Sequence, residues 1–219
     1  MSIDYIQMIL RPMLEGTKMT LFLFFVVICT SLPLGLLLTF AARTRFKPLT
    51  WLIQLYITVM RGTPLLLQLL FICFGLPLIP VVGDYLVLDR FVAACTGFIL
   101  NYAAYFAEIF RGGLLAVDRG QFEAAQVLGL NKWQTMTRII MPQMFRVSLP
   151  AVANETITLV KDTALLYAVA VPELLHYAQT AVNRDFTTLP YFVAGLIYLA
   201  ITLVLTALLK RIERRYQYQ

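Results

Sequence analysis

The chain has 219 residues, of which 60% are hydrophobic and 14% are charged, and its formal net charge is +6. Soluble domains are about 45–50% apolar and about 25% charged, and a soluble fold of this length leaves too much surface in water to bury so many apolar side chains. The composition therefore excludes an ordinary soluble protein and favours a membrane protein. The N-terminus lacks the basic start, short apolar run and cleavage site of a signal peptide, so we expect the first long apolar run to stay in the protein.

Spanning helices need about 20 mostly apolar residues each, and the chain offers five such stretches. The predicted spans cover residues 19–42, 49–74, 90–110, 147–171 and 191–209. Residues 1–18 carry apolar positions at helical spacing, and we expect them to form a short amphipathic helix along the outer interface. The second span contains Arg61, Gly62 and Pro64. There we expect a loosened helix whose free carbonyl groups receive the Arg61 guanidinium, with a hinge or gate as the alternative.

Lysine and arginine in short loops set the orientation, because such loops stay in the cytoplasm. On one side of the predicted spans lie only Arg11, Lys18, Arg90 and Arg184. The other side collects twelve basic residues: Arg43, Arg45, Lys47, Arg111, Arg119, Lys132, Arg138, Arg146, Lys210, Arg211, Arg214 and Arg215. An odd number of spans with the basic tail in the cytoplasm places the N-terminus outside. The positive charge is thus a topology signal, and we expect no nucleic-acid binding.

Few residues indicate enzymatic chemistry or metal binding. The only histidine, His176, falls in the predicted outer loop and is expected to be a surface residue. The three cysteines show no metal-ligand spacing and are interpreted as small core hydrophobes. They are Cys29, Cys73 and Cys95. No catalytic residue and no metal ligand is predicted, which argues against an integral membrane enzyme.

A polar segment, residues 119–142, interrupts the apolar chain inside a predicted cytoplasmic loop of about residues 111–146. Residues 121–130 contain good helix formers, and Gly129 suits a helix C-terminus. Pro142 then stops or kinks the chain. A helix of about ten residues is marginal alone in water, so it needs tertiary packing or a partner. The plain alternative is a solvated connecting helix at the membrane surface.

The spacing within this segment resembles the EAA motif of ABC-importer permeases. Glu123, Ala124 and Ala125 are followed after three residues by Gly129, and after nine more by the run Ile139-Ile140-Met141-Pro142. Methionine at 141 replaces the usual leucine. Other stretches are similar to the polar amino-acid branch of that family. They are MRGTPLL at 60–66, AYFAEIFRGG at 104–113, GQFEAA at 120–125 and LVKDT at 159–163.

The resemblance implies an all-α, five-span type I importer permease, a single transmembrane domain over residues 1–219 in a bacterial inner membrane. It implies that the EAA segment is a coupling helix that docks on a separate ATPase dimer, which binds ATP and Mg²⁺. The chain itself contains no G-x-x-x-x-G-K-[ST] phosphate loop, so no cofactor is expected in it. The other implied partners are a second permease subunit, identical or different, an extracytoplasmic amino-acid-binding protein, and the lipid bilayer.

Polar side chains within the spans are candidates for the substrate path, because such groups are costly in lipid and usually face a cavity. On the third span Asn101, Tyr105 and Glu108 share one face, and on the fourth Glu155, Thr158 and Asp162 share a face that Asn154 flanks. Local pairs are the alternative reading: Glu108 with Arg111, and Lys161 with Asp162. The two glutamates suggest a cationic amino acid as substrate.

A small secondary transporter or a channel subunit is the alternative function. Such transporters often contain inverted internal repeats, and no repeat is detectable in this sequence.

Overall fold

The computed structural model describes residues 3–81 and 83–217, and within these ranges every regular element is a helix. The predicted all-α fold is confirmed. The helices are α1 (Ile3–Ala41), α2 (Lys47–Gly62), α3 (Leu65–Leu70), α4 (Arg90–Leu115), α5 (Arg119–Val127), α6 (Lys132–Gln134), α7 (Met141–Asp162), α8 (Leu174–Asp185) and α9 (Leu189–Gln217). Short π-helical turns cover Phe71–Gly75 and Thr135–Ile140, and 3₁₀ turns cover Leu76–Leu78, Gly83–Leu86 and Thr163–Val169.

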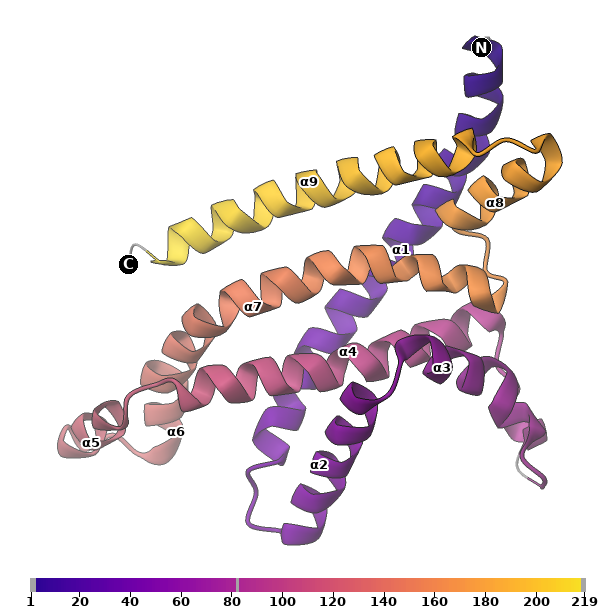
Figure 1. Ribbon diagram of the computed structural model, residues 1–219. Coiled ribbons are helices and arrows are strands. Elements are labelled where there is room, and N and C mark those ends of the chain that lie inside the picture. The colour runs from indigo at the N-terminus through magenta and orange to yellow at the C-terminus, as the bar shows by residue number, and fades with distance from the viewer. Residues whose placement is uncertain (1–2, 82, 218–219) are drawn as a thin grey trace.

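Helix α4 lies at the centre of the fold, with α1 crossing it and α7 running beside it (Figure 1). The helix begins where the Asp89 carboxylate accepts hydrogen bonds from the backbone N–H groups of Phe91 and Val92. Small and aromatic side chains alternate along it, and most are buried. The buried set includes Ala93, Ala94, Phe98, Tyr102, Ala103, Ala104, Phe106 and Ala107. The alanines let neighbouring helices approach closely, while the aromatic rings fill the remaining volume.

A close helix contact joins α1 to α4 at Gly35. A methyl group at this position would lie 2.7 Å from the Phe106 Cβ atom and 2.9 Å from the Ala107 nitrogen. One turn further on, the Thr39 hydroxyl donates a hydrogen bond to the Ala107 carbonyl at 2.9 Å. Glycine is thus required here by the approach of two backbones. The two other mid-span glycines differ: Gly97 faces the Leu69 side chain, and Gly195 has open space around it.

The predicted interfacial helix at residues 1–18 is wrong, because its described part continues without a break into the first span as α1. The reason is a second, smaller core. Ile9 and Met13 of α1 are buried against Leu174 and Ala178 of α8. The Glu173 carboxylate, also buried, caps α8 by accepting a hydrogen bond from the His176 N–H and takes another from the Tyr198 hydroxyl of α9. These contacts fix the start of α1 against α8.

The second predicted span is broken between α2 and α3, whose axes meet at 108°. Pro64 disfavours the helical conformation for the residue before it, and Thr63 is accordingly extended, with φ −121° and ψ 148°. In a bilayer the freed carbonyl groups of α2 need partners from within the protein. The Gln68 amide donates to the Met60 and Thr63 carbonyls, and the Asn101 amide donates to the Met60 carbonyl at 3.1 Å and to the Gln68 Oε1 atom at 2.9 Å. Amides, and not the expected Arg61 guanidinium, cap the broken helix.

Among the described residues three helices, α1, α4 and α9, are long and apolar enough to cross a membrane, and the bent pair α2 with α3 makes a fourth. Helix α7 has 22 residues, so it is about 33 Å long. Its polar side chains lower its mean hydropathy. The assignment of α7 as the fourth of five spans therefore stays a prediction. Cys95 is buried as expected, whereas Cys29 lies on the outer face of α1.

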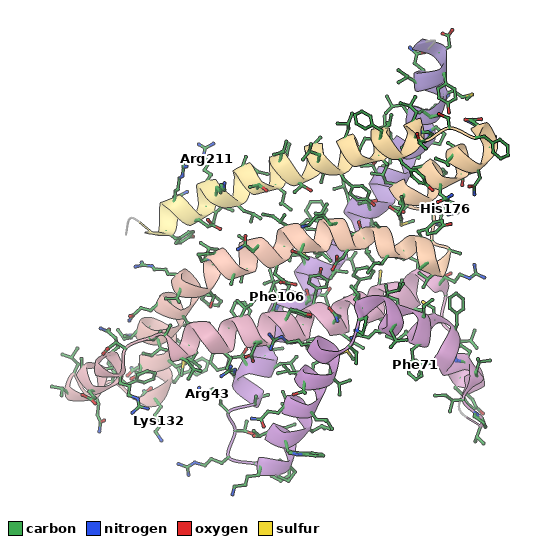
Figure 2. The ribbon with its side chains drawn as sticks, viewed as in Figure 1. Arg43, Phe71, Phe106, Lys132, His176 and Arg211 are labelled. Atoms are coloured by element: carbon green, nitrogen blue, oxygen red, sulfur yellow. The ribbon has the colours of Figure 1, made fainter. Side chains whose placement is uncertain are left out.

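The two ends of the molecule differ in charge. Figure 1 shows α5, α6 and the last turns of α9 at one end, and the start of α1 with α8 at the opposite end. Figure 2 places the basic residues Lys132 and Arg211 toward the first end and His176 at the second. The segments predicted to be cytoplasmic therefore lie together.

The contact at Gly35 predicts the effect of one methyl group. Gly35→Ala should lower the stability of the purified protein by about 1–3 kcal/mol, because the backbones of α1 and α4 must separate. Gly195→Ala is the matched control, since nothing lies within 4 Å of the added carbon. Thermal unfolding in detergent measures both, and equal melting temperatures for the two variants would contradict the close-packing assignment.

A second prediction concerns the amide network at the broken span. Asn101→Leu removes the donor to the Gln68 Oε1 atom and one of the two donors to the Met60 carbonyl, and it should cost about 1–3 kcal/mol because the Gln68 Oε1 atom is left unsatisfied. Asn154→Leu on the exposed surface of α7 is the control. The account is wrong at this point if the two leucine variants unfold at the same temperature.

Candidate functional site

The polar stripe of α4 faces α2, as the shared-face prediction requires. Asn101, 4% exposed, binds the Met60 carbonyl at the broken end of α2. Four residues later the Tyr105 ring lies under the Arg61 guanidinium, with 5.4 Å between the guanidinium carbon and the ring centroid. Glu108 follows, and its carboxylate also points to Arg61, at 3.7 Å. Each residue of the stripe therefore contacts the last turn of α2.

Glu108 is shared between two arginines. The Arg111 Nε atom, one turn along the same helix, donates to the Glu108 Oε2 atom at 2.8 Å, which confirms the predicted local pair. Arg61 reaches the same carboxylate from α2, a contact the sequence reading missed. A charge on a spanning helix is stabilised by such pairing. One carboxylate beside two guanidinium groups leaves a local charge of about +1.

A cavity of about 770 Å³ opens beside these charges, between α1, α2 and α4. Its polar lining comes from all three helices: Thr39, Arg43, Gln54, Thr58, Arg61, Glu108 and Arg111. Glu108 and Arg61 thus line a polar hollow and are not sealed in an apolar core. The lining can hold water or a polar solute, and it carries more donors than acceptors.

The polar residues of α7 divide into two groups. Asp162 accepts a hydrogen bond of 2.7 Å from the Tyr102 hydroxyl of α4, and the expected ion pair with Lys161 is absent from the described contacts. Glu155 is half-buried, and in the described part of the chain no salt bridge reaches it. Asn154 is exposed, and its carbonyl accepts a hydrogen bond from the Thr158 hydroxyl. The Glu155 carboxylate is therefore the candidate that remains open to an incoming cation.

Helix α5 is the predicted coupling helix, and its structure explains two residues of the EAA pattern. The Asp118 carboxylate caps its start by accepting from the Gly120 N–H. Ala125 is 2% exposed, because this face of α5 packs against the π-helical turn Thr135–Ile140. Gly129 has φ +73°, and the Gly129 and Leu130 N–H groups donate to the carbonyls of Gln126 and Ala125. This is the hydrogen-bond pattern of a Schellman C-cap, for which glycine is the preferred residue.

Two other pattern residues on α5 are turned outward. Glu123 and Ala124 are exposed, and so are large apolar side chains nearby: Val127 at 87%, Leu128 at 76% and Trp133 at 76%. A hollow of about 670 Å³ lies beside them, lined among others by Phe122, Gln126 and Met136. Exposed apolar groups on a polar loop mark an interaction surface. The sequence reading missed Leu128 and Trp133, although a tryptophan in a charged loop is itself a usable signal.

The opposite end of the molecule carries a second polar cluster. The Arg184 Nε atom donates to the Asp185 Oδ1 atom at 2.7 Å, and the Tyr5 hydroxyl donates to the Oδ2 atom. The hydrogen bond from Arg184 lowers the pKa of the Asp185 carboxyl below its ordinary value. Over the described residues no three metal-ligating side chains come together. This cluster therefore ties α8 to α1 by charge and hydrogen bonds.

Comparisons with known proteins agree with these features. The family model described as binding-protein-dependent transport system inner membrane component matches residues 31–218. The arginine transport system permease protein ArtQ of Bacillus subtilis (strain 168) is 38% identical, over 92% of this chain and 91% of its own. The glutamine transport system permease protein GlnP of Escherichia coli (strain K12) is 37% identical, over 93% of this chain and 92% of its own.

A solved structure has the same fold. A chain from the crystal structure of an amino acid ABC transporter with histidines superposes with a TM-score of 0.87 and 33% identity, over 98% of this chain and 100% of that chain. The inward-facing MetNI methionine ABC transporter, with a TM-score of 0.75 and 19% identity over 99% of both chains, shares the fold alone. The resemblance to ABC-importer permeases is thereby confirmed. This chain belongs to the family of binding-protein-dependent transport system inner membrane components, as a multi-pass permease subunit whose ATPase is a separate subunit.

Proposed function

We propose that the chain is the translocating subunit of an importer for polar amino acids. Two relatives that each match more than 90% of this chain are named as arginine and glutamine permeases, and the transporter of highest similarity among the structures above is an amino-acid transporter. The observation that carries the proposal is the EAA geometry: a capped, rigid α5 with exposed apolar side chains at one end of a membrane fold. This surface gives a separate ATPase subunit a place to bind.

The proposed topology has five spans with the N-terminus outside. The fourth span is α7, whose polar residues face α4 through the Tyr102–Asp162 hydrogen bond. Helix α5 and the end of α9 lie at the same end of the molecule, and both carry basic residues (Figures 1 and 2). Basic loops stay cytoplasmic, so this end faces the cytoplasm. The whole described chain then forms one transmembrane domain.

Docking of the ATPase is proposed at α5. Coupling requires a contact that fits differently in the ATP-bound and nucleotide-free states. The helix is fixed at its start by Asp118 and at its end by Gly129, and Ala125 anchors it to the rest of the fold. Helix α5 packs against the π-helical turn Thr135–Ile140 that leads into α7, and α4 ends only four residues before α5 begins. Apolar contacts to the ATPase come from the outward-facing side chains of Val127, Leu128 and Trp133.

A second permease subunit completes the path in this proposal. In a single chain the cavity between α1, α2 and α4 is open to one side. A dimer, identical or not, would cover that side and produce a continuous route. Two ATPase subunits then drive alternation between outward-open and inward-open states, and an extracytoplasmic binding protein delivers the substrate to the end formed by α8.

The substrate proposal is a cationic amino acid, with Glu155 as its main partner. Glu108 already has two guanidinium neighbours, so its charge is largely compensated. Glu155 is half-buried without such a partner in the described structure, and charge-assisted hydrogen bonds from a guanidinium or ammonium group would offset its lost hydration. A neutral substrate would instead use amide groups, of which the exposed Asn154 lies next to Glu155.

The coupling proposal predicts the effect of a change at Gly129. A valine at φ +73° is strained by about 1–2 kcal/mol, so Gly129→Val should unravel the C-cap of α5 and abolish both uptake and transport-linked ATPase stimulation. Asn tolerates this conformation, so Gly129→Asn should retain most activity. Gly112→Val, at an exposed helical position with open space, is the control. Proteoliposome uptake and ATPase assays provide the readout; normal coupling in Gly129→Val would exclude α5 as the coupling helix.

The substrate proposal predicts a selective loss. Glu155→Gln keeps the size of the side chain and removes its charge, so uptake of arginine or lysine should fall at least tenfold while any glutamine uptake persists. Competitive uptake in proteoliposomes with purified binding protein measures the ratio. Thr156→Val, at a buried position of the same helix outside the candidate substrate path, controls for general disturbance of α7. If wild type and Glu155→Gln carry glutamine equally and neither carries a cationic amino acid, the cationic assignment is refuted.

A further inference from the structure

A groove of about 480 Å³ lies where the start of α7 meets the end of α9. One wall is apolar and comes from Met141, Phe145 and Leu149 of α7. The polar groups of the groove are Thr137 of the π-helical turn, Arg146 of α7 and Tyr216 in the last turns of α9. The groove thus joins an apolar surface to a guanidinium and a phenol, and nothing in the translocation path or the coupling helix uses it.

The charge around this groove is strongly positive. Arg146 is exposed, and its guanidinium forms no ion pair in the described contacts. The neighbouring end of α9 adds four exposed basic residues and one acidic residue. The basic ones are Lys210, Arg211, Arg214 and Arg215, and the acidic one is Glu213. As far as the described side chains extend, none of the four is paired with a carboxylate. A ligand that binds here must therefore be anionic at one end and apolar at the other.

In the proposed orientation the groove lies at the level where the bilayer changes from acyl chains to headgroups. The apolar stretch of α9 ends at Leu209, and Tyr216 is about two turns, or about 10 Å, beyond it. Tyrosine is enriched at this depth because its ring is apolar and its hydroxyl is polar. The apolar wall of α7 then faces the outer part of the acyl region, and Arg146 faces the headgroups.

We infer that this groove binds an anionic phospholipid of the cytoplasmic leaflet, with the phosphate on Arg146 and the α9 basic residues and an acyl chain along α7. Basic pockets between spanning helices on the cytoplasmic side bind anionic headgroups, and both halves of such a lipid have a matching surface here. The inference rests on the proposed orientation, which places this end in the cytoplasm. It adds a lipid-binding site that the import function itself does not require.

The test uses the assembled transporter with its ATPase, released from vesicles that contain equal amounts of phosphatidylglycerol and phosphatidylethanolamine. Native mass spectrometry then counts the lipids that remain bound. Phosphatidylglycerol should be retained in preference to phosphatidylethanolamine. Arg146→Gln and Tyr216→Ala, both at exposed positions, should each reduce the retained phosphatidylglycerol, the first about fivefold for the loss of one basic group. Arg11→Gln, exposed at the other end of the molecule, is the control and should have no effect.

Equal retention of the two lipids would overturn the inference, and so would unchanged retention of phosphatidylglycerol in Arg146→Gln. Loss of the retained lipid on adding inorganic phosphate would also overturn it, because that result would indicate a simple anion site. A groove covered by the second permease or by the ATPase would also give no retained lipid. Lipid retention is read without transport, and uptake is measured on the same preparation. A complex that retains phosphatidylglycerol but imports no amino acid would therefore refute the proposed function and leave this inference standing.

Discussion

The hydrogen bonds that the Gln68 and Asn101 amides donate to the broken end of α2 are the interaction on which the rest of the site depends. A spanning segment cannot stop halfway through a bilayer unless its free carbonyl groups find donors inside the protein. Pro64 causes the break in the helix, and the two amides satisfy the carbonyl groups that the break leaves free. The bend in turn sets the end of α2 against α4 and directs Arg61 toward Tyr105 and Glu108.

The charges follow from that arrangement. Arg61 and Arg111 compensate Glu108 from two helices, at the side of a polar cavity. Arg111 lies in the last turns of α4, and α5 begins at Arg119, so the polar cavity and the coupling surface are connected by one short stretch of chain. Only residues 116–118, which are not helical, separate the two helices. Glu155 on α7 has no salt bridge among the described residues.

Periodicity and spacing predicted much of this structure. The helical fold, α5 with a glycine at its end, the shared face of Asn101, Tyr105 and Glu108, and the Glu108–Arg111 pair were all readable, because each is a local consequence of helical geometry. Helix α5 occupies Arg119–Val127, close to the predicted residues 121–130.

The predictions that failed concern contacts between residues distant in sequence. Residues 1–18 could not be recognised as part of α1, because α8, which holds them, is more than 150 residues away in the chain. The partner of Asp162 is Tyr102 on another helix, whereas adjacency in sequence suggested Lys161. Arg61 was expected at the free carbonyls of its own helix, and only the fold shows that Gln68 and Asn101 occupy them. Gly195 shows the same limit, since mid-span position alone does not reveal which helix, if any, approaches a glycine.

The central claim is that α5 faces the cytoplasm at the same end as the C-terminal basic residues, where the ATPase subunit can bind it. Site-directed labelling tests it directly, in a chain whose three cysteines are replaced by alanine. A cysteine at Val127 should react with a membrane-impermeant maleimide only after the cells are opened, and a cysteine at Phe186, 93% exposed at the end of α8, should react in intact spheroplasts. Labelling of position 127 in intact spheroplasts, with position 186 protected, would contradict the account.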